Sequence, residues 1–168
     1  MENRKKYIAY GSNMDTGQMR YRCPTAKVIG TGEIKDYELL FRGHERGAYA
    51  TIEPKEGGSV PVLVWEVGPE DERNLDIYEG YPRFYGKQEL EVQTEHGTES
   101  IMVYIMNSGH SMGMPSKEYL DTIKRGYAEA GLPLTPLYEA VEKAQRRAEE
   151  KMEQMEMEET PWTQQQQL

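Results

Sequence analysis

Two short stretches of this sequence carry side chains that could do chemistry. The first is Tyr7-Ile8-Ala9-Tyr10-Gly11-Ser12-Asn13, an apolar run of strand type that stops abruptly in Gly-Ser-Asn. Glycine lets a ligand approach the main chain, and backbone N–H groups at such a turn can hold an anion or a developing oxyanion when a helix follows. The alternative interpretation is structural, because a strand that runs into a turn and a helix N-cap has the same pattern.

The second stretch is Leu75-Asp76-Ile77-Tyr78-Glu79-Gly80, where Glu79 lies at the end of a predicted helix. The C-terminal end of a helix is partly negative, so it disfavours an exposed carboxylate by roughly 0.3–1 kcal/mol. The aromatic neighbours Tyr78, Tyr81 and Phe84 indicate partial burial, which raises the pKa of a carboxyl group. Glu79 is therefore a candidate general acid and base, and the alternative is a solvated surface glutamate.

Other residue types that could do chemistry lack the spacing for it. The histidines His44, His96 and His110 are far apart and there is a single cysteine, so the sequence predicts no zinc site. That cysteine, Cys23, has no base near it in the sequence, which favours a buried structural thiol. Ser12 is not in a G-x-S-x-G context, and the chain has no Walker loop or dinucleotide fingerprint.

Composition excludes several classes of partner. The formal net charge of −9 argues against a nucleic-acid backbone or an anionic membrane as the main partner. The single cysteine cannot form an internal disulfide, which fits a reducing compartment. No apolar segment follows the charged N-terminus and no run approaches the length of a membrane span. We therefore expect a soluble, cytoplasmic protein.

The elements that must position these residues are mostly short strands. A helix begins at Pro69 and ends at Gly80, another follows Ser116 and runs to Ala130, and a last helix starts at Pro136. This order is not a regular βαβα alternation, and it predicts an α+β fold with a mixed, barrel-like β-sheet and flanking helices. Strands are expected over 7–10, 26–34, 37–41, 49–52, 60–67, 85–94 and 98–106.

The 168-residue length predicts one domain of ordinary size, over residues 1–148. Residues 149–168 form an acidic, Met- and Gln-rich tail with little that could enter a core. We expect this tail to be helical at first and disordered over 161–168.

Three motifs in order resemble the γ-glutamylcyclotransferase-like family. Tyr10-Gly11-Ser12-Asn13 is similar to the signature strand and loop of that family, and 75–80 followed by Tyr85 is similar to its catalytic segment. Pro115-Ser116-Lys117-Glu118-Tyr119, then Gly126 and Gly131-Leu132-Pro133, resembles its C-terminal segment. The likeness runs from about Tyr7 to Tyr138.

The resemblance implies a mixed β-barrel that needs neither a metal ion nor an organic cofactor. Its reaction would be cyclisation of the γ-glutamyl group of a small-molecule substrate to 5-oxoproline, with release of an amine or amino acid. Glu79 matches the catalytic acid/base of the family. The residues that match its substrate-binding positions are Tyr7, Ile8, Ala9, Tyr10, Gly11, Ser12, Asn13, Tyr85 and Tyr119. The family includes dimers, so the resemblance leaves a homodimer open.

This chemistry agrees with the residue types present. The α-amine of the substrate attacks its own γ-carbonyl, so the enzyme must fold the substrate and carry protons, without supplying a nucleophile. The loop 80–84 would select the leaving amine, whose identity the sequence does not give. Two alternatives stay open: a non-catalytic barrel that binds a small ligand or a partner, and an amidohydrolase that releases glutamate.

Overall fold

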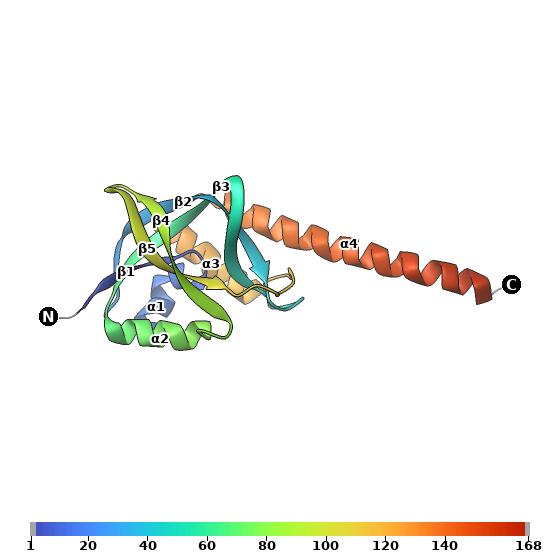
Figure 1. Ribbon diagram of the computed structural model, residues 1–168, viewed down its shortest axis with the longest axis horizontal. Helices are drawn as coiled ribbons and strands as arrows, with labels where there is room; N and C mark the ends of the chain where they lie inside the picture. The colour runs from blue at the N-terminus through green and yellow to red at the C-terminus, as the bar shows by residue number, and fades with distance from the viewer. Residues whose placement is uncertain (1–2, 167–168) are drawn as a thin grey trace.

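A closed five-stranded barrel forms the body of the chain in the computed structural model, which describes residues 3–166 (Figure 1). The strands follow one another around the barrel in the order β1-β3-β2-β4-β5. Neighbouring strands are antiparallel except for β1 and β5, which pair in parallel at Tyr7 and Met102. The bounds are β1 Lys5–Ala9, β2 Lys27–Arg42, β3 Tyr49–Val67, β4 Tyr85–Thr94 and β5 Gly97–Met106. The predicted α+β fold with a barrel-like sheet is confirmed.

Strands β2 and β3 are longer than the sequence predicts. The sequence indicates breaks near Asp36 and over 54–58, but each strand is continuous through its break. The register moves from Lys35 opposite Ser59 to Tyr37 opposite Pro54, so the predicted turn is a bulge that faces Asp36. Asp36 has a φ of 62°, and its Oδ1 accepts a hydrogen bond from the Gly57 amide at 3.0 Å. Such a bulge bends both strands without ending their pairing.

The helices lie at the ends and on the outside of the barrel. They are the short 3₁₀ helix η1 Ser12–Met14, α1 Thr16–Arg22, α2 Pro69–Glu79, α3 Lys117–Ala130 and α4 Thr135–Gln166. The predicted end signals are confirmed for α2 and α3. Pro69 opens α2, and Gly80 ends it with a φ of 64°. Ser116 Oγ accepts from the Tyr119 amide at 3.2 Å, and Gly131 ends α3 with a φ of 68°.

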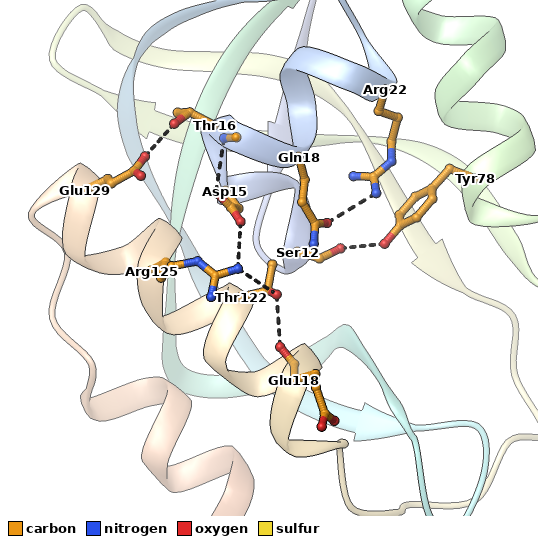
Figure 2. A network of polar contacts seen from close by, with 11 residues as sticks. Ser12, Asp15, Thr16, Gln18, Arg22, Tyr78, Glu118, Thr122, Arg125 and Glu129 are labelled. Atoms are coloured by element: carbon orange, nitrogen blue, oxygen red, sulfur yellow. Dashed lines mark hydrogen bonds and ion pairs between the residues drawn. The ribbon is translucent and has the colours of Figure 1, made fainter.

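Helix α3 packs directly on η1, which positions the Gly-Ser-Asn loop. A Cβ atom built on Gly126 would lie 2.5 Å from the Cβ of Met14, so only glycine allows this approach. Arg125 of α3 donates to Asp15 at 3.2 Å and Thr16 donates to Glu129 at 2.6 Å (Figure 2). These contacts hold the loop between the barrel and α3.

Helix α4 packs on the barrel through its first turns and then extends away from it (Figure 1). Leu137, Ala140 and Ala144 are buried, and Lys143 forms an ion pair with Glu38 of β2 at 2.5 Å. The helix continues to Gln166 through part of the range where the sequence predicts disorder, and residues 167–168 lie outside the described residues. The domain boundary at 148 stays a prediction. Among the helices described, none is both long and apolar enough to cross a membrane.

Candidate active site

A cavity of about 400 Å³ opens between the end of β1, the end of α2 and the start of β3. It brings together every site residue that the sequence predicts, although these come from β1, η1, α2, β4 and α3. The predicted residues in its lining are Tyr7, Ile8, Ala9, Tyr10, Gly11, Ser12, Asn13, Glu79, Tyr85 and Tyr119. Their roles in catalysis and binding stay predictions.

Glu79 is the last residue of α2 and points into this cavity. Its Oε1 accepts a hydrogen bond from Asn13 Nδ2 at 3.2 Å. Burial raises the pKa of the Glu79 carboxyl to about 7, although the positive charge of Arg22 acts to lower it. A carboxyl with this pKa can both accept and donate a proton near neutral pH.

Asn13 connects several of the groups around the carboxyl. Its Nδ2 also donates to Tyr7 Oη at 2.8 Å, and its Oδ1 accepts from Arg22. Its backbone carbonyl accepts from Trp65 Nε1 at 3.1 Å. Both the main chain and the side chain of this buried residue are therefore fixed.

Tyrosine hydroxyls form much of the polar lining. Tyr10 donates to the Tyr104 carbonyl at 2.7 Å, and Tyr85 donates to the Ala50 carbonyl at 2.6 Å. Tyr119 Oη accepts from the Ala50 amide at 3.0 Å, which leaves its own proton available to a ligand. Burial raises the pKa of all these hydroxyls, so they stay neutral at physiological pH.

Gly11 and Ser12 shape the floor of the cavity. A Cβ atom on Gly11 would lie 3.3 Å from the Cβ of Ala50 and 3.4 Å from Tyr119 Oη, so a side chain here would occupy the cavity. Ser12 Oγ lies 2.9 Å from Tyr78 Oη (Figure 2). Ser12 is thus paired with a tyrosine hydroxyl and not with a histidine or carboxylate that could activate it, which does not favour a role as a nucleophile.

The sequence does not predict the rest of the lining. Tyr49 and Ala50 of β3, with Tyr104 of β5, reach the site only because the barrel closes. His44 lines the cavity, whereas His96 and His110 are not among its lining residues. In the loop 80–84, only the two end residues, Gly80 and Phe84, line the cavity. The lining residues not predicted are His44, Tyr49, Ala50, Ile77, Tyr78, Gly80, Phe84 and Tyr104.

A smaller cavity of about 200 Å³ is lined by residues of α1, and Cys23 also lines it. The thiol is buried, as predicted, and burial raises the pKa of Cys23 to about 12. Within residues 3–166, no three His, Cys, Asp or Glu side chains are grouped so that they could hold a metal ion.

Comparison with known proteins gives a consistent result. The profile of the family described as "Gamma-glutamyl cyclotransferase, AIG2-like" matches residues 7–126. The chain is 30% identical to the γ-glutamylcyclotransferase of Homo sapiens over 136 residues, which covers 76% of this chain and 72% of the relative. The protein of Bos taurus matches with the same identity and coverage. A solved structure titled "Gamma-glutamyl cyclotransferase" superposes with a TM-score of 0.72 at 29% identity, over 85% of this chain and 87% of that one.

Proposed function

Since this chain belongs to the gamma-glutamyl cyclotransferase, AIG2-like family of enzymes, we propose that it cyclises a γ-glutamyl amide to 5-oxoproline with Glu79 as the general acid and base. The observation that supports this proposal is the environment of the Glu79 carboxyl. This carboxyl lies in the cavity, receives a hydrogen bond from Asn13, and has a pKa of about 7. A single carboxyl of this kind can take up and return a proton in one catalytic cycle.

The reaction needs the substrate to fold back on itself. Glu79 accepts a proton from the α-ammonium, and the freed amine attacks the γ-carbonyl carbon to form the C–N bond of a five-membered ring. Glu79 returns the proton to the departing nitrogen as the original C–N bond breaks. The second proton that the ring nitrogen sheds leaves with the amine, which is released as an ammonium ion. Tethering of the two reacting groups supplies an effective concentration on the order of 10⁵ M or more.

Other groups that line the cavity could stabilise the negative charge that develops on the substrate during the reaction. The tetrahedral intermediate carries a negative oxygen, which hydrogen-bond donors fixed in advance would stabilise. In this proposal the amides of Gly11, Ser12 and Asn13 are such donors, for the oxyanion or for the α-carboxylate of the substrate. The phenol of Tyr119 is a further donor, because its oxygen already accepts from the Ala50 amide.

Product analysis tests the reaction directly. The protein is incubated with γ-glutamyl-alanine, γ-glutamyl-ε-lysine and glutathione, and the products are identified by mass spectrometry. We expect 5-oxoproline with at least one substrate. Release of glutamate in its place would make the protein an amidohydrolase, and no turnover would favour a non-catalytic barrel that binds a small ligand. The substrate that reacts identifies the leaving amine.

The Glu79→Gln variant tests the assigned residue. Loss of a general acid/base group lowers kcat by about 10²- to 10⁴-fold. The matched control is Glu70→Gln in the same helix, because the Glu70 side chain is 86% exposed. We expect the control to keep wild-type kcat. Full activity of Glu79→Gln would show that Glu79 is not the proton carrier.

A further inference from the structure

Arg22 is the last residue of α1 and contacts two residues that line the cavity, Tyr78 and Asn13. A cation is favourable at this end of a helix. Its guanidinium lies 3.3 Å from the centroid of the Tyr78 ring and donates to Gln18 Oε1 at 3.3 Å (Figure 2). It also donates to Asn13 Oδ1. Arg22 is not among the residues that line the cavity, so we expect no direct contact between Arg22 and a ligand there.

The contact with Asn13 decides which way the carboxamide faces. A guanidinium has only donors, so it must meet the oxygen of the amide. The NH₂ group is then directed to Tyr7 Oη and Glu79 Oε1, where it donates to both. A carboxamide turned by 180° would place Oδ1 against the carboxylate, and that contact is repulsive.

The contact with Tyr78 fixes the end of α2. Tyr78 precedes Glu79 in the chain. Its side chain is partly exposed, so few packing contacts fix its position on the solvent side. Its ring lies under the Arg22 guanidinium, and its hydroxyl lies 2.9 Å from Ser12 Oγ. These two contacts join α1, η1 and α2 next to the candidate proton carrier.

We propose that Arg22 is a positioning residue for the cyclisation: it orients the Asn13 carboxamide toward Glu79 and holds the last turn of α2 through Tyr78. This inference rests on the proposed function of Glu79. It assigns a role to a residue outside the cavity, on a helix that supplies none of the predicted site residues.

Arg22 also supplies the positive charge near Glu79. Four phenols also interact electrostatically with the carboxyl: Tyr7 of β1, Tyr10 directly after β1, Tyr85 of β4 and Tyr119 of α3. The pKa of each of these phenols is raised by burial, so they carry no charge at neutral pH. Loss of the Arg22 charge should therefore raise the pKa of Glu79 further and move the acid limb of the pH profile to higher pH.

Two variants separate orientation from charge. Arg22→Lys keeps the positive charge but loses the planar fork and the stacking on Tyr78. Arg22→Met loses both. Arg20→Met removes an equal charge from an exposed position of the same helix and is the matched control. Each variant is first checked for wild-type folding by chemical denaturation.

Two readouts are measured for each variant. The first is the pKa of the Glu79 carboxyl by ¹³C NMR, which does not require activity. The second is the pH profile of kcat and kcat/KM for 5-oxoproline release. We expect Arg22→Lys to lower kcat about 10-fold, as misplacement of a reacting group does, with the Glu79 pKa near its wild-type value. Arg22→Met should lower kcat at least as much and raise the Glu79 pKa by roughly 0.5–1.

Unchanged kcat in Arg22→Lys together with an unchanged Glu79 pKa in Arg22→Met would overturn the proposal. An equal effect of Arg20→Met would also overturn it, because a change in net charge would then suffice. If the wild-type protein releases no 5-oxoproline, the proposed function fails. The NMR readout still tests whether Arg22 controls the Glu79 carboxyl.

Discussion

The cavity that η1 helps to line and the cavity that α1 helps to line differ in chemistry, although each has a buried titratable group in its lining. The larger contains Glu79, and the smaller is lined by Cys23. Burial raises the pKa of both groups, to about 7 for Glu79 and about 12 for Cys23. The same physical cause therefore moves the carboxyl into the neutral range and moves the thiol away from it.

The hydrogen-bond partners of Glu79 and Cys23 increase the difference between the pKa values of these two groups. Asn13 donates to Glu79, which stabilises the charged carboxylate that accepts a proton. The Cys23 thiol faces the backbone carbonyl of Asp71 at 3.5 Å, an acceptor that favours the protonated thiol. A buried group is thus prepared for proton transfer only where burial brings its pKa toward the working pH and a partner supports both protonation states.

The largest expected effect concerns the reactivity of Cys23. A rise in pKa from 9.0 to about 12 reduces the thiolate fraction at pH 8 by about 10³-fold, and the thiolate is the nucleophile. We expect iodoacetamide to modify the native protein at least about 10³-fold more slowly than the unfolded chain, as measured by intact mass. Modification at similar rates would show that the two cavities do not differ in this way. Cys23→Ala should keep kcat/KM within about two-fold.

A second test compares how stability depends on pH. The folded-state pKa of Glu79 is raised above the value of 4.5 in the unfolded chain. Its contribution to stability is therefore fully present below about pH 4.5 and is lost as the pH rises through about 7, because a proton must leave a desolvated carboxyl. From the pKa difference, the loss between about pH 4 and pH 8 is about 3 kcal/mol relative to Glu79→Gln.

Chemical denaturation of wild type, Glu79→Gln and Cys23→Ala over this pH range measures the effect. The difference between wild type and Glu79→Gln should change with pH. The difference between wild type and Cys23→Ala should stay nearly constant, since the thiol is protonated in both folded and unfolded chains over most of the range. A constant difference for Glu79→Gln would contradict the raised pKa of the carboxyl.

A third test concerns the packing of α3 on η1, which positions the larger cavity's Asn13 and does not involve the Cys23 cavity. Gly126→Ala would place a methyl group 2.5 Å from the Cβ of Met14, so η1 must move. We expect the free energy of unfolding to fall by about 1–3 kcal/mol, as in other overpacked sites, and kcat to fall as Asn13 is displaced. The alkylation rate of native Cys23 should change less than kcat.

Gly17→Ala in α1 is the matched control for this test. The nearest atom to its added Cβ would be Asp15 Oδ1 at 3.4 Å, an ordinary contact. It should raise the free energy of unfolding by about 0.5–1 kcal/mol through helix propensity and leave kcat unchanged. Wild-type kcat in Gly126→Ala would show that the position of η1 does not limit the reaction.

The sequence predicts those parts of the site that depend on local signals. Glu79 is recognisable because Gly80 ends a helix directly after it and aromatic residues surround it. The Gly-Ser-Asn loop is recognisable because a buried strand ends there. Both signals lie within a few residues of the group concerned.

The parts that the sequence does not predict depend on contacts between distant segments. Ala50 contributes its backbone N–H to Tyr119 and its carbonyl to Tyr85, groups that almost any residue carries. The bulge opposite Asp36 keeps β2 and β3 continuous because residue 57 donates to that side chain, so the turn signals there do not end a strand. Arg22 belongs to no recognisable sequence motif, and the role that we propose for it follows only from the way α1 lies against Tyr78.

The smallest expected effect comes from the end of the chain, which lies outside both cavities. Helix α4 packs on β2 and buries Leu137, Ala140 and Ala144, whereas Met152, Met155 and Met157 are exposed. Beyond 148, Lys151 forms an ion pair at 3.5 Å with the largely exposed Glu45 of the loop between β2 and β3, and such pairs contribute about 0–1 kcal/mol. A chain that ends at Ala148 should therefore unfold with a free energy within about 1 kcal/mol of wild type and keep kcat/KM within about two-fold. Size-exclusion chromatography of both chains is the companion measurement. A large loss of activity together with a smaller particle would place residues 149–168 in an assembly on which the Glu79 cavity depends. The difference between the two cavities would then no longer be a property of the barrel alone.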